Sequence, residues 1–400
     1  MVQPLTLRVK LIGTREAELA LRDTAVAYTA SFNRCTQLGY LMQPLNGVEL
    51  HKQTYRSEIE ATQLPSQLVC SARVKATEAV AGVNALRKKG KKVSCPVSHG
   101  SSIRYDARSA MIKLKEGRCT LATLRKRQSF TFKIPAYAAD RVDLKVCSSD
   151  VVQHRNGHLY LHIVLAHPVP DFVPIGNVEG VDLGVVRPAV SSQPLFLGTR
   201  FWREIQNRFF RLRRRLQSKG TRSAKRHLKR LSQRENRFRK DCDHVLSKLL
   251  AHSVPAGSIL VLEDLTDIRS RVQWRKRQRR RMHGWSFERF QVFLGYKCAL
   301  LGIQVVYADA RYTSQKCSYC GHTSKANRKS QSAFECQWCD LSLNADLNAA
   351  RNLKNNYLAA RGTSPRGGLP VRAPIVSAKY QGETVFTPDP SLALETSPRF

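Results

Sequence analysis

The sequence predicts an α+β protein built from several domains. Its length of 400 residues suffices for two to four domains with a sizeable core. Segments with helical apolar spacing alternate with short runs in which apolar and polar residues alternate, as in β-strands. Near the C-terminus, two C-x2-C pairs stand fifteen residues apart, a spacing typical of a small metal-binding module. Together these observations predict mixed structure with an inserted module.

The N-terminal part predicts a β-barrel that carries inserted helices. Residues 1–12 contain a short alternating strand, and residues 13–92 have the apolar spacing of helices. Residues 93–172 hold several short strands separated by turn signals, among which Asn156-Gly157 is a strong hairpin signal. We therefore expect the first strand to join the later strands in one barrel, with the helices between them.

Acidic residues lie in two strands of the next part. The apolar strand GNVEGVDLGVVRPAV carries Asp182, with Gly180 and Gly184 beside it. Glycines at such places permit close approach of a phosphate backbone or a metal. The strand SILVLEDL ends in Glu263-Asp264. Because side chains alternate across a strand, only one of this acidic pair can face the same side as Asp182.

An amphipathic helix and a further strand follow. The stretch WSFERFQVFLGYKCALLG places Phe290, Leu294, Cys298 and Leu301 on one stripe, which we interpret as core and not as a cofactor site. The strand GIQVVYADA comes next.

The cysteine module occupies residues 311–340, and the predicted zinc ligands are Cys317, Cys320, Cys336 and Cys339. Four thiolates complete a tetrahedral shell and leave no open position, so the predicted role of zinc is structural. Three aromatic residues lie beside the ligands: Tyr319, Phe334 and Trp338. We expect them to pack in a module with little core, with base stacking as the alternative.

Asp346 directly follows the module, where ADLNAARNL opens a short helix. The order of strand with acid, strand with acid, helix, strand, and helix with acid is that of a ribonuclease H-like fold. In that arrangement three distant carboxylates converge on two divalent ions, and Mg²⁺ prefers carboxylate oxygen to thiolate. The sequence therefore favours a metal-dependent nuclease site.

The composition favours nucleic acid as the partner. The chain has 67 Lys and Arg residues against 30 Asp and Glu, a formal net charge of +37. Residues 201–240 hold sixteen basic residues and two acids, with apolar residues at helical spacing on both sides of Gly220. Residues 271–281 hold seven basic residues and no acid. We interpret both runs as phosphate-binding surfaces, and Trp274 as a candidate stacking residue; a solvated charged face is the alternative.

Signals for export or membrane insertion are not found in the sequence. The N-terminal stretch has no apolar run long enough for a signal peptide, and no segment approaches a membrane span. The seven cysteines outside the module have no paired spacing, as expected for reduced thiols. We expect a soluble cytoplasmic protein, associated with the nucleoid in a prokaryote, and a disordered tail over residues 359–400.

The motifs GVDLGV, VLEDL and ADLNAARNL resemble the three RuvC motifs of the TnpB family, and YTSQKCSYCGHTS before ECQWC is similar to its zinc-finger signature. TnpB proteins are transposon-encoded RNA-guided nucleases related to type V CRISPR effectors. The resemblance implies that Asp182, Glu263 and Asp346 bind magnesium and are catalytic, and it favours Glu263 over Asp264. It also implies that Cys317, Cys320, Cys336 and Cys339 bind zinc.

The resemblance further implies a domain layout. Residues 1–12 and 93–172 would form a wedge β-barrel, and residues 13–92 a helical recognition domain. Residues 173–310 and 341–358 would form the RuvC-like nuclease domain, with residues 311–340 as the zinc-finger insertion.

The implied function is RNA-guided cleavage of target DNA at one two-metal site, licensed by a short target-adjacent motif. The implied partners are a guide RNA from the element's end and target DNA, in a monomeric ribonucleoprotein. Three alternatives stay open from the sequence. They are a compact type V CRISPR effector, an RNA-guided binding protein without cleavage, and a zinc-ribbon nucleic-acid-binding protein that uses no guide.

Overall fold

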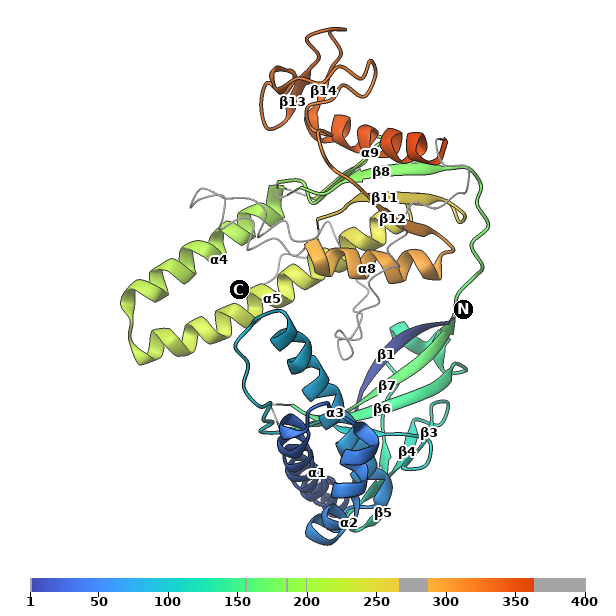
Figure 1. Cartoon of the computed structure of the whole chain (residues 1–400), viewed down its shortest axis with the longest axis vertical. Coiled ribbons are helices and arrows are strands. Elements are labelled where there is room, and N and C mark those ends of the chain that lie inside the picture. The colour runs from blue at the N-terminus through green and yellow to red at the C-terminus, as the bar shows by residue number, and fades with distance from the viewer. Residues whose placement is uncertain (1, 155–156, 185, 199, 266–286, 363–400) are drawn as a thin grey trace. The chain divides into compact units, whose positions relative to one another are not determined.

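The computed structural model describes residues 2–154, 157–184, 186–198, 200–265 and 287–362 (Figure 1). The described chain divides into two compact units, residues 2–167 and residues 168–362. The basic run 271–281, Trp274 and most of the predicted tail lie outside the described residues. None of the helices in the described ranges combines the length and apolar character that a bilayer crossing requires.

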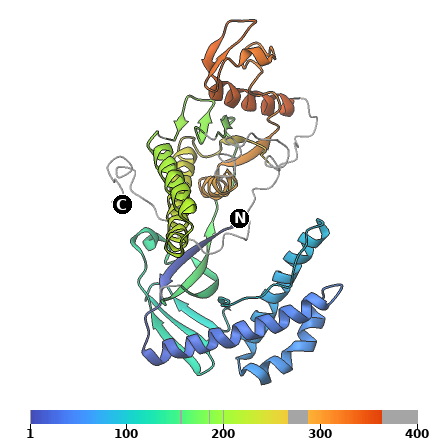
Figure 2. The same cartoon turned by 90° about the vertical axis from the view of Figure 1, so that its left-hand side faces the viewer.

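The first unit contains one long strand, three helices and a set of later strands (Figure 2). Its elements are β1 (Val2–Lys10), α1 (Arg15–Leu41), α2 (Gly47–Thr62), α3 (Ser66–Lys88), β2 (Ile103–Tyr105), β3 (Ala110–Lys113), β4 (Arg118–Thr123), β5 (Lys126–Thr131), η1 (Ala136–Arg141), β6 (Lys145–Gln153) and β7 (Leu159–Pro168). Local sequence fixes two of the helix starts, since Thr14 and Asn46 accept hydrogen bonds from the free N–H groups of the first turns of α1 and α2.

The strands of this unit form two sheets that share one core. Their strand orders are β1-β7-β6-β2 and β3-β4-β5, and the bridge between Ile12 and Thr131 links them. Side chains from both sheets and from α1 and α3 meet in a single hydrophobic cluster that includes Tyr28, Tyr105 and Phe130. The structure thus has helices in residues 13–92 and strands in residues 93–172, while the barrel appears as two linked sheets.

The second unit is built on a five-stranded sheet. Its elements are β8 (Val178–Asp182), β9 (Ala189–Ser191), β10 (Phe196–Leu197), α4 (Arg200–Lys219), α5 (Arg222–Ala251), β11 (Ile259–Glu263), α8 (Phe287–Leu300), β12 (Gln304–Ala308), η2 (Lys325–Asn327), β13 (Ala333–Glu335), β14 (Ser342–Asn344) and α9 (Ala345–Gly362). The strand order is β10-β9-β8-β11-β12, in which β8, β11 and β12 are parallel and β9 and β10 form an antiparallel edge.

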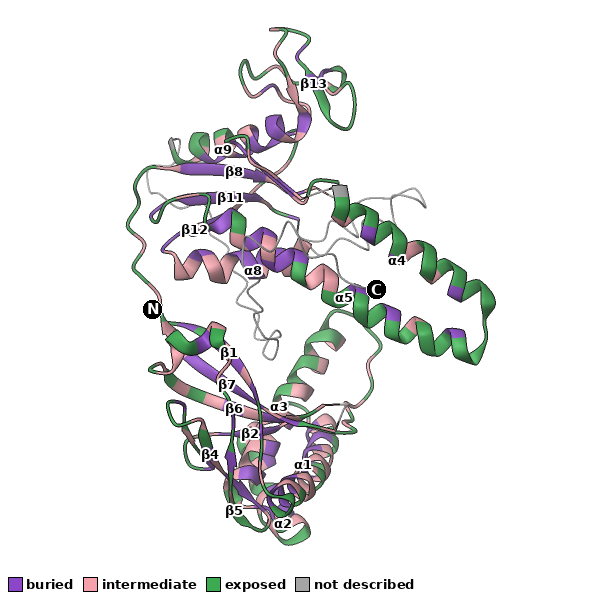
Figure 3. Cartoon of the chain, turned by 180° about the vertical axis from the view of Figure 1, so that it is seen from behind, coloured by how far each residue is buried: buried purple, intermediate pink, exposed green. Residues whose placement is uncertain are grey.

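Helices cover both faces of this sheet, with α9 on one face and α8 and α5 on the other (Figures 1 and 3). The residues of β11 alternate between the faces, as a buried strand requires. Val261 packs with Leu353 of α9, whereas Leu260 and Leu262 pack with residues of α5 and α8. The stripe of Phe290, Leu294 and Cys298 is buried in this second cluster, so its interpretation as core is confirmed.

Candidate active site and zinc module

Asp182 and Glu263 end neighbouring parallel strands on the same face of the sheet. The register pairs Leu262 with Val181, so the next residues of the two strands, Glu263 and Asp182, lie side by side. Val178 and Ile259, at even spacing from these acids, pack with α9, and the two carboxylates therefore face α9 as well. Asp264 is exposed, and as the residue after Glu263 it points to the opposite face of the sheet.

The third acid comes from α9, which lies unusually close to β8. A Cβ atom on Gly180 would stand 2.0 Å from the carbonyl oxygen of Ala350 and 2.7 Å from the backbone nitrogen of Lys354. Gly180 therefore makes room for the helix backbone, and the expectation that it lets a phosphate backbone or a metal approach is wrong at this position. Close contact between β8 and α9 brings the first turn of α9, with Asp346, to the end of the sheet where Asp182 and Glu263 lie.

The electrostatics of the three acids show that they lie near one another. Burial raises the pKa of Asp182 well above its ordinary range, and the charges of Glu263 and Asp346 raise it further. Burial also raises the pKa of Glu263 to about 7 and raises that of Asp346. Half-buried carboxylates that lie close together favour a bound cation, and hard oxygen donors of this kind suit Mg²⁺. The donor set thus fits the metal that the sequence predicts.

Sequence reasoning missed two arginines at this site. Arg328, from the zinc module, places Nη2 3.9 Å from Oδ1 of Asp346, and its charge lowers the pKa of both Asp346 and Asp182. Arg187 also lowers the pKa of Asp346. It stands in the turn after β8, where Gly184 permits the carbonyl of Arg187 to approach closely. A basic residue in each of two loops gave no sequence signal beyond the general excess of charge.

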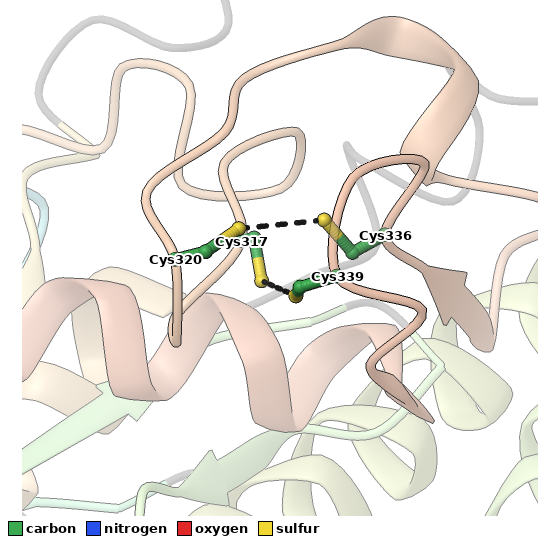
Figure 4. A group of neighbouring side chains, drawn as sticks. All are labelled: Cys317, Cys320, Cys336 and Cys339. Atoms are coloured by element: carbon green, nitrogen blue, oxygen red, sulfur yellow. Dashed lines mark hydrogen bonds between the residues drawn. The ribbon is translucent and has the colours of Figure 1, made fainter.

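The four cysteines of the module converge on one point (Figure 4). Their sulfur atoms all lie within 4.8 Å of one another. The Sγ atoms of Cys317 and Cys339 are 3.7 Å apart, and those of Cys320 and Cys336 are 3.6 Å apart. A tetrahedron with Zn–S bonds of about 2.3 Å has edges of about 3.8 Å, so the cluster is compatible with zinc.

The two C-x2-C turns have the same backbone hydrogen bonds. The N–H of Gly321 donates to the carbonyl of Cys317, and the N–H of Asp340 donates to that of Cys336. Both donors have positive φ, +79° and +53°, a conformation that Gly and Asp adopt more readily than most residues. His322 accepts a hydrogen bond from the N–H of Cys317 through its carbonyl, and its ring is not part of the sulfur cluster.

Two buried asparagines of α9 attach the module to the helix. The side-chain nitrogens of Asn348 and Asn352 both donate to the carbonyls of Thr313 and Lys316. The side-chain oxygen of Asn348 accepts from the N–H of Ser318. Since the two asparagines are four residues apart, they share one face of the helix. The repeated Asn in ADLNAARNL is the sequence signal for this contact.

The aromatic residues of the module differ in burial. Phe334 is fully buried in the small core between the cysteines, as predicted. Tyr319 and Trp338 are 82% and 77% exposed, so the expectation that they pack is wrong. Each precedes the second cysteine of its pair, where the turn points the side chain out of a module too small to cover it.

The first basic run, residues 201–240, forms an antiparallel helix pair (Figure 1). Ile205, Phe209 and Leu216 of α4 pack against Ala224 and Leu231 of α5, so the predicted apolar stripe joins the two helices. Glu235 is buried between Arg213 and Arg239, with which it forms ion pairs. Most of the remaining basic residues point outward, as a phosphate-binding surface requires.

Comparisons with known proteins agree with the sequence motifs. Residues 287–353, from α8 into α9, match the family model described as Cas12f1-like, TNB domain. The chain is 30% identical over 260 residues to the putative RNA-guided DNA endonuclease InsQ of Escherichia coli, covering 59% of this chain and 63% of that protein. It is 33% identical over 128 residues to the TnpB-like protein MJ0751 of Methanocaldococcus jannaschii, covering 32% of this chain and 45% of that protein.

The resemblance to the TnpB family predicted from the sequence is thereby confirmed, although the chain spans less than two thirds of the length of these relatives. A solved Cas12f1–sgRNA–target DNA complex has a similar fold, with a TM-score of 0.62 at 12% identity. The alignment covers 89% of this chain and 99% of the Cas12f1 chain. This likeness confirms a mixed α and β fold of the Cas12 type.

Proposed function

We propose that this relative of the TnpB-like and Cas12f proteins is an RNA-guided DNA endonuclease that cuts target DNA at a single RuvC-like site. The observation that carries the proposal is the meeting of three carboxylates from β8, β11 and α9. Asp182, Glu263 and Asp346 are the residues that would hold magnesium. Two magnesium ions, when bound there, supply the Lewis acidity for in-line cleavage of a phosphodiester.

Other features of the chain would position the metal ligands and bind the substrate. The parallel strands hold the backbones of Asp182 and Glu263 side by side, so the two carboxylates start from neighbouring positions before substrate arrives. Arg328 and Arg187 bring positive charge to the same place, where a scissile phosphate gathers negative charge. The outward cations of α4 and α5 would hold the nucleic-acid backbone by charge and not by sequence.

The finer domain assignment is part of this proposal. Residues 173–310 and 341–358 would form the ribonuclease H-like nuclease domain, supported by the observed order of acid-bearing strands and helices. Residues 311–340 would form a structural zinc finger that holds Zn²⁺ through its four cysteines. Residues 1–12 and 93–172 would form the wedge barrel, and residues 13–92 the recognition domain. The proposed partners are a guide RNA of transposon origin and target DNA beside a short licensing motif.

The test is magnesium-dependent cleavage by the purified chain with the RNA that copurifies with it. Asp182→Asn, Glu263→Gln and Asp346→Asn should each abolish detectable cleavage and leave RNA binding intact, since each removes a metal ligand. Asp264→Asn is the matched control, because Asp264 is the neighbour of Glu263 on the other face of the strand. Full cleavage by any of the first three variants would refute the assignment.

Two other functions remain distinguishable. The match to a Cas12f1-like domain favours a compact type V CRISPR effector as the second candidate. Sequencing of the copurifying RNA separates the two, since repeat-derived RNA indicates a CRISPR effector and RNA from a transposon end indicates a TnpB nuclease. A zinc-ribbon binding protein would copurify with no RNA of defined sequence and would cut nothing.

A further inference from the structure

The zinc module exposes two aromatic side chains at equivalent places, but their surroundings differ. The Trp338 ring lies beside the imidazole of His322, with ring centres 6.2 Å apart. Tyr319 has no ring partner among the described residues and is 82% exposed. An uncovered aromatic ring at this position offers a flat apolar face to a ligand.

Tyr319 borders a cavity of about 280 Å³ between the first cysteine turn, α9 and the end of β9. Ligand pockets commonly measure about 300–1,000 Å³, so this one suits a single small unit. The polar residues that line it are Ser192, Ser318, Tyr319, Arg351, Lys354 and Asn355. All of them belong to the unit formed by residues 168–362.

The walls of the cavity are held by hydrogen bonds. The hydroxyl of Ser192 donates to the carboxylate of Glu179 and accepts from the N–H of Gly180. The side-chain nitrogen of Asn355 donates to the carbonyl of Ser318 at 3.1 Å, which fixes the cysteine turn against α9. The cavity is thus defined by its own packing before any ligand binds.

Two cations face this cavity without compensation. Arg351 and Lys354 are half-buried, and within the described ranges neither forms an ion pair with a carboxylate. Similar positive charges kept close together favour a bound anion, and an arginine can bind phosphate in a bidentate manner. The cavity therefore combines a phosphate-binding pair with an exposed stacking ring, and a nucleotide contains both complementary groups.

We propose that this cavity binds one nucleotide of a single-stranded nucleic acid, with the base on Tyr319 and a phosphate between Arg351 and Lys354. A strand is favoured over a free nucleotide because the exposed ring leaves the base open to its neighbours and because the chain carries a net charge of +37. Arg351 and Lys354 lie five and eight residues beyond Asp346 on α9, about 7.5 Å and 12 Å along the helix axis, and none of the three carboxylates lines the cavity. The inference rests on the proposed function only in taking nucleic acid as the partner.

The test measures binding of a fluorescein-labelled 12-nucleotide oligodeoxythymidine to the full chain, with its zinc and copurifying RNA retained and no magnesium added. Tyr319→Ala should weaken binding about 5- to 100-fold, the range for loss of one stacking aromatic, and Tyr319→Phe should bind like the parent. Trp338→Ala is the matched control, because Trp338 is equally exposed at the equivalent position but does not line the cavity. It should stay within about twofold of the parent, since it removes no contact at the cavity.

The charged pair has a separate readout. Arg351→Gln/Lys354→Gln should reduce the slope of log affinity against log salt by about 0.7, since the two cations share one phosphate and each phosphate contact on a single strand contributes about 0.7. Zinc content and melting temperature equal to those of the parent show that each variant is folded. Parent-like binding by Tyr319→Ala, an equal loss in Trp338→Ala, or an unchanged salt slope would each overturn the proposal.

Thymidine 5′-monophosphate distinguishes the two sources of a nucleotide. If it displaces the oligonucleotide at micromolar concentration, the cavity is a mononucleotide site and the strand proposal is wrong. The binding series is repeated in Asp182→Asn, because binding needs no cleavage. Persistent cleavage in Asp182→Asn would overturn the proposed nuclease site and leave the cavity result standing. Loss of cleavage in Asp182→Asn, together with parent-like oligonucleotide binding by Tyr319→Ala, would overturn the cavity alone.

Discussion

Arg328 of the zinc module lies against Asp346, the first acid of α9, with Nη2 3.9 Å from Oδ1. This contact connects the module to the candidate active site through charge as well as through the chain. Burial raises the pKa of Asp346, and the charge of Arg328 partly offsets this rise. Positive charge at that point competes with a metal cation and attracts a phosphate, so its removal has two opposed effects.

We predict that Arg328→Ala lowers the magnesium concentration needed for half-maximal cleavage, since a competing cation is lost. At saturating magnesium, cleavage should be about 100-fold slower, the usual effect of losing one charge-stabilising donor. Magnesium titrations of cleavage check both effects. Lys325→Ala, an exposed neighbour in the same module, is the control and should change neither quantity more than about twofold.

Gly180 should not tolerate a side chain. We predict that Gly180→Ala destabilises its unit by about 3 kcal/mol or more, because its Cβ would overlap backbone atoms of α9 that cannot rotate away. Differential scanning calorimetry checks the prediction. Gly82→Ala is the contrasting substitution, since nothing lies within 4 Å of that position in α3 and alanine favours helix by up to about 1 kcal/mol. Equal melting of Gly180→Ala and the parent would show that β8 and α9 do not pack so closely.

The effects on stability of replacing Asn348 and Asn352 should not be additive. Each of the carbonyls of Thr313 and Lys316 keeps one donor when a single asparagine is replaced and loses both in the double variant. We predict that Asn348→Ala/Asn352→Ala costs about 1–3 kcal/mol more than the two single changes together, as for neighbours that share partners. Thermal unfolding of the four proteins gives this coupling. Additive effects would mean that water replaces the missing donors.

Loss of the zinc ligands should reduce cleavage through the position of Asp346, which follows the module in the chain. In Cys317→Ser/Cys320→Ser we predict a lower melting temperature and cleavage reduced at least about tenfold, because the module that positions the start of α9 loses its closed thiolate shell. Cys147→Ser is the control, since Cys147 is an exposed free thiol outside the module. Atomic absorption should find zinc in the control and not in the double variant.

Lys297 makes the stability of the second unit depend on pH. Burial lowers the pKa of Lys297 to about 7, and Lys248 lowers it further. Lys297 donates to the carbonyl of His244 and to the hydroxyl of Ser247, bonds that a neutral amine also makes. Between pH 7 and about 10 the unfolded chain binds this proton and the folded chain does not, so stability from this group rises with pH by up to about 1.4 kcal/mol per unit.

We therefore predict that Lys297→Met removes this rise. The difference in unfolding free energy between the variant and the parent should change steadily from pH 7 to pH 9 and stay constant below pH 6, where both states are protonated. Denaturant titrations at each pH give the comparison. A difference that does not vary with pH would show that Lys297 keeps its charge in the folded protein.

Several features of the site could be predicted from the sequence because they depend on local patterns. Alternation along β11 restricts which acid can face Asp182, and the spacing of Cys317 and Cys320 defines a thiolate turn. The contact of Arg328 with Asp346 could not be predicted, since it depends on how a loop packs against a helix. The exposure of Tyr319 was missed because the expectation of packing assumed more hydrophobic core than a module of this size possesses.

The helix that packs against Gly180, α9, is translated after the strands that it covers. Asp182 and Glu263 emerge from the ribosome well before Asp346, and the sheet that carries them has its α9 face open until that helix arrives. A nascent chain therefore holds at most two of the three carboxylates. Completion of the proposed site therefore requires translation of α9, and a chain that ends before that helix lacks Asp346.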